Sequence, residues 1–96
     1  MTMKKKLSND KSRFVRSHNS VGEAIFKPGQ SVDEHKHETA YEVFYIQSGK
    51  AEFVVNGEVY LVQEGDCVTI EPNEPHLQRN PFSADVVWLY FMVAID

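Results

Sequence analysis

Three histidines and one glutamate have the residue types and spacing of a metal site. His35 and His37 are separated by one residue, Glu42 follows shortly afterwards, and His76 lies much later. Residues two apart on a strand face the same side roughly 7 Å apart, so both imidazoles could converge on one ion. Such a mixed nitrogen and oxygen set suits one divalent transition metal: Fe, Mn, Ni, Cu or Zn. Four protein ligands leave an octahedral ion with open positions for a substrate or O₂.

Other polar side chains are weaker candidates. Gln78 follows His76 by two residues, so alternation puts both on one face, where Gln78 could orient a substrate. A solvent-facing Gln78 is nearly as plausible from the sequence. Tyr90 could serve as an acid, although tyrosines in such segments are usually core residues. We find no Ser/His/Asp or Cys/His arrangement that would act without a metal, and a buried, inert thiol is the simplest interpretation of Cys67, the single cysteine.

Short strands must position these side chains. The chain breaks into apolar pieces rich in β-branched and aromatic residues, with no convincing helical period. The expected strands cover residues 21–27, 32–37, 41–48, 51–56, 58–63, 67–70, 76–80 and 86–95.

Turn signals separate these pieces. Asn56-Gly57 supplies the two positive-φ positions of a type I′ hairpin turn. A second turn is expected at residues 64–66, and Pro72 and Pro75 bracket a loop that no central strand would tolerate. Many short strands at close spacing predict an all-β sandwich or barrel.

The last expected strand is apolar on both faces. Trp88, Tyr90 and Met92 share one face, and Leu89 and Phe91 share the other, so either set could line the interior. The remaining face must be covered by N-terminal strands or by a second subunit. A homodimer is therefore one of two equally plausible arrangements.

Length and charge limit the functional classes. A chain of 96 residues fits one domain. Residues 1–16 hold six of the ten basic side chains, so residues 1–12 are expected to form a flexible basic tail before a domain at 13–96. The remainder is too acidic to attract nucleic acid, and the tail could equally be a tag remnant or a solubilising arm. Residues 86–95 are too short to span a membrane as a helix, so we expect a cytoplasmic protein.

The spacing of eight residues resembles the cupin family. Its first motif reads Gly, five residues, His-x-His, three or four residues, Glu, six residues, Gly. Its second reads Gly, five residues, Pro-x-Gly, two residues, His, three residues, Asn. The matching residues are Gly29, His35, His37, Glu42, Gly49, Gly65, His76 and Asn80. Two positions depart: Glu71 stands where Pro is expected, and Asn73 stands where Gly is expected. Asn tolerates positive φ, so a left-handed turn can survive there.

This resemblance implies a double-stranded β-helix, a jelly-roll barrel of two antiparallel sheets with a metal inside. The ligands implied are His35, His37, Glu42 and His76. Similar proteins include dioxygenases, isomerases, decarboxylases and lyases that use the metal as a Lewis acid or O₂ site. The alternative is a non-catalytic barrel that binds or senses a sugar or carboxylate, and fold alone does not choose between them. A DNA-binding regulator is disfavoured because 96 residues leave no room for a helix-turn-helix.

Overall fold

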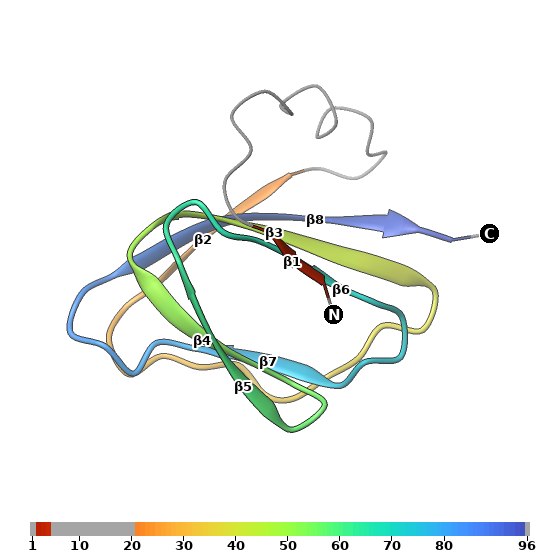
Figure 1. Ribbon diagram of the computed structural model, residues 1–96, viewed down its shortest axis with the longest axis horizontal. Helices are drawn as coiled ribbons and strands as arrows, with labels where there is room; N and C mark the ends of the chain where they lie inside the picture. The colour runs from red at the N-terminus through yellow and green to blue at the C-terminus, as the bar shows by residue number, and fades with distance from the viewer. Residues whose placement is uncertain (1, 5–20, 96) are drawn as a thin grey trace.

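Two antiparallel sheets face each other in the computed structural model, which describes residues 2–4 and 21–95 (Figure 1). One sheet has five strands in the order β1-β6-β3-β8-β2, and the other has three in the order β5-β4-β7. The strands are β1 (Thr2–Lys4), β2 (Gly22–Phe26), β3 (Ala40–Ser48), β4 (Lys50–Val55), β5 (Glu58–Gln63), β6 (Cys67–Ile70), β7 (His76–Arg79) and β8 (Val86–Ala94). This confirms the predicted all-β, double-stranded β-helix. The described part of the chain contains no helix long and apolar enough to cross a membrane.

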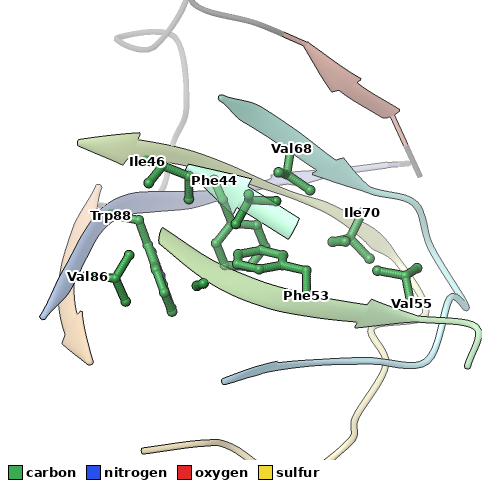
Figure 2. Close-up of a cluster of buried hydrophobic side chains, with 10 residues drawn as sticks. Phe44, Ile46, Phe53, Val55, Val68, Ile70, Val86 and Trp88 are labelled. Atoms are coloured by element: carbon green, nitrogen blue, oxygen red, sulfur yellow. The ribbon is translucent and has the colours of Figure 1, made fainter. Parts of the chain in front are cut away.

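The core lies between the two sheets and is built from alternating residues of facing strands (Figure 2). Phe44 of β3, Phe53 of β4 and Trp88 of β8 form its aromatic centre. The Phe44 and Phe53 rings meet edge to face with centroids 4.9 Å apart, and the Phe53 and Trp88 centroids are 5.5 Å apart. Such tilted contacts are favourable beyond the burial of apolar area. They hold β3, which carries Glu42, against β4, the neighbour of the strand β7 that carries His76.

Two predicted turns are present. Asn56 and Gly57 have φ of 52° and 80°, as a type I′ hairpin between β4 and β5 requires. Between β5 and β6, Gly65 has a φ of 91° and the Asp66 N–H donates to the Gln63 carbonyl over 2.9 Å. Apart from residues 32–37, the predicted strands from residue 21 onward agree with the structure to within one residue at each end.

Residues 32–37 do not form the predicted strand. The segment touches β7 through two isolated bridges, Ser31 with Arg79 and His35 with His76. Most side chains here are polar and exposed, so little burial favours a regular ladder. The His35 Nδ1 also bonds locally to the Asp33 carbonyl over 2.9 Å, a contact that competes with strand pairing.

The N-terminus differs from the loose tail expected from the sequence. Thr2–Lys4 form β1 and pair antiparallel with β6, in register with Cys67–Thr69. The edge of β6 offers N–H and C=O groups that a polar segment can pair with through its backbone alone. Such pairing needs no apolar pattern, so the residues of the segment did not predict this strand. The rest of the predicted tail and the predicted boundary between residues 12 and 13 lie outside the described residues.

The two faces of β8 have different surroundings. Val86 and Trp88 are buried in the core. The face of β8 that carries Trp88, Tyr90 and Met92 is therefore the inner face. Tyr90 nevertheless is 37% exposed, because its ring lies over Gly22 of the edge strand β2. Phe91, on the outer face, is only 8% exposed. Burial of β8 therefore does not follow simple alternation.

Candidate metal centre

Glu42 and His76 come from facing sheets and meet in the interior. Glu42 lies in β3, a central strand of the five-stranded sheet, and is 9% exposed. His76 begins β7 in the three-stranded sheet and is 0% exposed. The His76 Nε2 and the Glu42 Oε1 are 3.2 Å apart. Alternation places both side chains on the inner faces of their strands, as predicted.

Backbone hydrogen bonds hold the two remaining histidines beside this pair. The His35 N–H donates to the His76 carbonyl over 2.9 Å, and the His76 N–H donates back to the His35 carbonyl over 2.8 Å. The Asn73 N–H donates to the His37 carbonyl over 2.7 Å. The loop segment that carries His35 and His37 is therefore fixed at both histidines, although it is not a strand.

The four candidate ligands converge on one point. One nitrogen or oxygen atom from each of the four residues lies within 4.8 Å of the other three, and the His37 Nε2 is 3.3 Å from the Glu42 Oε1. Two ligands at right angles about an ion at about 2.1 Å would be about 3.0 Å apart, and opposite ligands about 4.2 Å apart. Small side-chain rotations would bring this set to coordination distances.

One orphaned atom fits this arrangement. The His37 Nε2 is buried and has no hydrogen-bond partner among the described residues. A buried polar atom without a partner is rare and costs free energy. An imidazole nitrogen beside a carboxylate and two further imidazoles is a good donor for a divalent transition metal, which would satisfy it.

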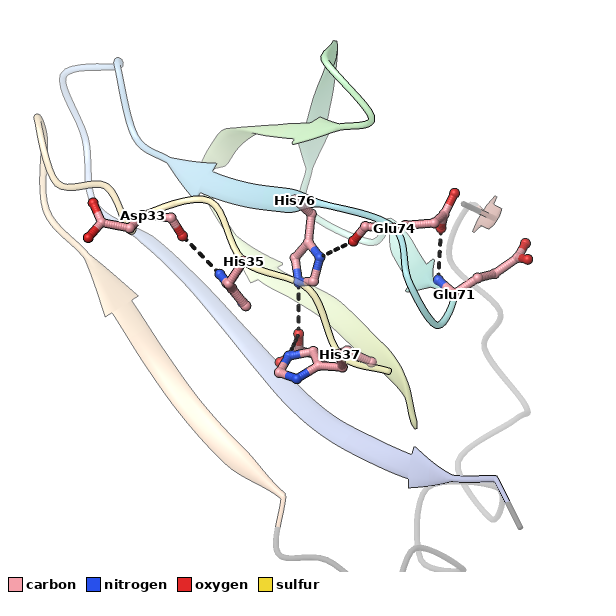
Figure 3. Close-up of polar contacts among 7 residues, drawn as sticks. Asp33, His35, His37, Glu71, Glu74 and His76 are labelled. Atoms are coloured by element: carbon pink, nitrogen blue, oxygen red, sulfur yellow. Dashed lines mark hydrogen bonds and ion pairs between the residues drawn. The ribbon is translucent and has the colours of Figure 1, made fainter. Parts of the chain in front are cut away.

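Backbone carbonyls orient two of the rings. The His76 Nδ1 is 2.8 Å from the Glu74 carbonyl, and the His35 Nδ1 is 2.9 Å from the Asp33 carbonyl (Figure 3). A carbonyl oxygen only accepts, so each Nδ1 must carry the proton and donate it. The Nε2 of each ring then presents its lone pair, as is common for metal-bound histidines. The sequence did not reveal these partners, because any residue type supplies a backbone carbonyl.

Charge around His76 favours its protonated form in the absence of an ion. Burial lowers the pKa of His76, but hydrogen bonds to the Glu42 carboxylate and the Glu74 carbonyl outweigh it and leave the pKa raised. The same carboxylate that favours a proton on His76 would favour a metal cation there. The electrostatics of the cluster therefore suit a positive charge.

The other predicted site residues lie in different places. Gln78 is 5% exposed and shares the inner face of β7 with His76. Tyr90 leans from β8 towards Gly22 in β2, whereas Glu42 lies in β3 on the opposite side of β8. Arg79 lies on the opposite face of β7 from His76, and its Nε donates to the Glu52 Oε1 over 2.9 Å. Of the two candidates beyond the ligand set, the geometry favours Gln78 over Tyr90.

Both departures from the second motif leave the ligand geometry intact. Asn73 has a φ of 67°, so it adopts the left-handed conformation that the motif glycine would supply. Asn80 is 1% exposed, and its Nδ2 donates to the carbonyls of Phe26 and Ala84 over 2.9 and 2.8 Å. Its Oδ1 accepts from the Phe82 N–H over 2.9 Å. Asn80 thus caps the turn that follows β7.

Comparison with known proteins finds related sequences and structures. An uncharacterised protein of Methanocaldococcus jannaschii is 36% identical over 61 residues, which are 64% of this chain and 49% of that protein. An oxalate-binding protein of Thermotoga maritima is 32% identical over 68 residues, which are 71% of this chain and 56% of that protein. The chain therefore spans about half the length of these relatives.

A solved structure shares the fold over nearly the whole chain. The crystal structure of a predicted oxalate decarboxylase from Thermotoga maritima matches with a TM-score of 0.78 at 28% identity. The match covers 97% of this chain and 79% of that one. The model of the cupin domain matches residues 22–93, which contain both motifs and the four converging side chains. The chain belongs to the cupin family.

Proposed function

We propose that the protein holds one divalent transition-metal ion with His35, His37, Glu42 and His76, and that this site acts on a small carboxylate. The observation that carries the proposal is the convergence of four ligand atoms within 4.8 Å, including the His37 Nε2, which is buried and makes no hydrogen bond. A carboxylate is the proposed ligand because the 32% identical relative is an oxalate-binding protein.

The residues of the site have two roles, holding the ion and orienting the rings that hold it. Three imidazoles and the Glu42 carboxylate hold the ion, and the Asp33 and Glu74 carbonyls keep the rings of His35 and His76 oriented. His35 is exposed and His37 is half-buried, so ligands enter on their side of the cluster. A bound divalent ion supplies Lewis-acid chemistry to a carboxylate oxygen.

Binding without turnover is the second candidate function. The polar neighbour of His76 on the inner face is Gln78, whose amide cannot transfer a proton at ordinary pH. The lack of an acid or base at this position favours binding without turnover. The Tyr90 ring lies over β2 and is not directed towards Glu42. Metal-dependent conversion therefore relies on the ion, whereas simple binding requires nothing more than the groups present.

Calorimetric titration tests the carboxylate proposal. Oxalate is titrated into manganese-loaded and metal-free protein, with glucose as a neutral comparison. We expect oxalate to bind only to the loaded protein and glucose to bind to neither. Equal oxalate binding with and without manganese, or no oxalate binding at all, would contradict the proposal. Conversion of oxalate to carbon dioxide and formate by the loaded protein would identify an enzyme. Binding of oxalate without product would identify a binding protein.

A homodimer in the cytoplasm is part of the same proposal. Five large hydrophobic side chains are exposed on the outer face of the five-stranded sheet or at its C-terminal end: Val21, Ile25, Tyr41, Val93 and Ile95. Exposed apolar side chains that share one face of a sheet are typical of a protein interface. The chain has a single cysteine, Cys67, so it forms no disulfide within itself, which suits a reducing compartment.

A further inference from the structure

The side chain of Gln78 has a buried donor without a partner. Gln78 is 5% exposed, and its Nε2 has no hydrogen-bond partner among the described residues. It lies two residues after His76 in β7, so both side chains face the interior at a spacing of roughly 7 Å. The unpartnered donor is therefore a close neighbour of the four candidate ligands.

The surroundings of Gln78 do not satisfy this donor. Gln78 pairs with Phe53 of β4, whose ring packs against Phe44 and Trp88. The Gln78 carbonyl accepts from the Val32 N–H over 3.1 Å, which fixes its backbone. Aromatic rings offer no ordinary acceptor, and an ordered water would need two to four polar partners of its own. An apolar residue would pack here without an unsatisfied amide, so the donor has a use other than stability.

The charges around the site restrict the ligand. A divalent ion with Glu42 and three neutral imidazoles carries one net positive charge, which one carboxylate would balance. The four basic side chains of residues 21–95 are all outside the buried interior: Lys27, Lys36, Lys50 and Arg79. No described side chain inside could therefore recognise a second carboxylate, and oxalate would be held by the ion alone. A neutral acceptor oxygen is the group that the neutral Gln78 amide matches.

We propose that Gln78 selects the ligand of this site by donating a hydrogen bond from its Nε2 to an uncharged second oxygen of a metal-bound monocarboxylate. The ligand class is then a small 2-oxo or 2-hydroxy acid. This inference rests on the proposed carboxylate function and deepens it. Gln78 acts as a specificity-determining residue through the buried donor and does not hold the metal.

Paired ligands test this role in the metal-loaded protein. Pyruvate and propionate have the same carboxylate and chain length, but only pyruvate has the 2-oxo oxygen. Their dissociation constants are measured by calorimetry for wild type and for Gln78→Met, which keeps the length of the side chain and removes the donor. Gln78→Leu provides a second apolar variant, and Gln47→Leu changes an exposed glutamine of β3 as the control. Metal content and melting temperature are measured for each protein.

We expect Gln78→Met to weaken pyruvate binding about tenfold and to leave propionate binding within about twofold of wild type. Metal content should be unchanged, and the melting temperature should be equal or higher because an unpartnered polar group is removed. A structural role for Gln78 would instead lower the melting temperature and leave the ratio of the two affinities unchanged. That result, with wild type still binding pyruvate, overturns the role of Gln78 alone. Failure of loaded wild type to bind pyruvate, propionate and oxalate overturns the carboxylate proposal as well.

Discussion

Two of the four candidate ligand side chains, those of His35 and His76, are oriented by backbone carbonyls that the ligand motif does not include. The Nδ1 atoms of His35 and His76 donate to carbonyls two residues earlier in the chain, and the His37 carbonyl accepts from the Asn73 N–H. These contacts set the ring orientations and the path of the loop that carries His35 and His37. The convergence of the four side chains could be predicted from spacing, because histidine and glutamate at these intervals are a specific signal. Their orienting partners could not, because backbone carbonyls have no sequence signature.

Asn73 tests the conformational role of the altered motif position. Its φ of 67° is allowed for Gly and tolerated by Asn, but it costs an alanine or a branched residue about 1–2 kcal/mol. We expect Asn73→Gly to change the free energy of unfolding by less than about 0.5 kcal/mol, and Asn73→Ala to lower it by about 1 kcal/mol. Urea unfolding of metal-free protein measures both. An equally stable Asn73→Ala would show that the left-handed turn is not required.

Asn80 links three segments through one buried amide. It bonds to the backbone of Phe26, Phe82 and Ala84, so its removal leaves three backbone groups without these partners. We expect Asn80→Ala to lower the free energy of unfolding by at least about 2 kcal/mol. The exposed Gln47→Ala should lie within about 0.5 kcal/mol of wild type. A neutral Asn80→Ala in the same urea measurement would contradict this account of the turn.

At the scale of elements, alternation and turn chemistry predicted most strands, and tertiary pairing decided the exceptions. The hairpin at Asn56-Gly57 follows from local φ preferences alone, so it was predictable. Residues 32–37 pair with β7 through an isolated bridge at His35 and form no regular ladder, which no local pattern specifies. Thr2–Lys4 form a strand because β6 has a free edge. Pairing with a distant strand cannot be read from the residues of one segment.

The packing of β2 against β8 depends on the absence of a side chain at Gly22. A Cβ at this position would lie 2.4 Å from the Tyr90 Cζ, so the ring would have to move. We expect Gly22→Ala to lower the free energy of unfolding by about 1–2 kcal/mol. Tyr90→Ala combined with Gly22→Ala should show a smaller cost for the alanine at residue 22, as a double-mutant cycle measures. Additive costs would indicate that Tyr90 and Gly22 do not constrain each other.

At the scale of the whole molecule, the outer face of the five-stranded sheet accounts for the apolar pattern of β8. Leu89, Phe91 and Val93 alternate with the inner-face residues, so both faces of this strand are apolar. The sequence predicted that both faces of β8 pack against other parts of a protein, but it did not predict which parts these are. The three-stranded sheet covers the inner face.

A second copy of the chain is the proposed cover for the exposed apolar outer face. We expect wild type to run as a dimer in light scattering coupled to size exclusion, and the variant Ile25→Lys to shift it towards monomer. Ile25 is 55% exposed, so the change should not disturb the core. Val59→Lys, at an exposed apolar position on the three-stranded sheet, is the matched control and should remain dimeric. A monomeric wild type at all accessible concentrations would contradict the dimer.

The central claim is that His35, His37, Glu42 and His76 hold one metal ion between the two sheets. Metal content by mass spectrometry tests it most directly, on proteins loaded with manganese or zinc and freed of excess ion. The account predicts about one ion per chain in wild type and in Glu38→Ala, an exposed carboxylate in the same loop, and a loss of nearly all metal in His37→Ala and Glu42→Ala. Full metal content in both His37→Ala and Glu42→Ala, with both proteins folded, would contradict it.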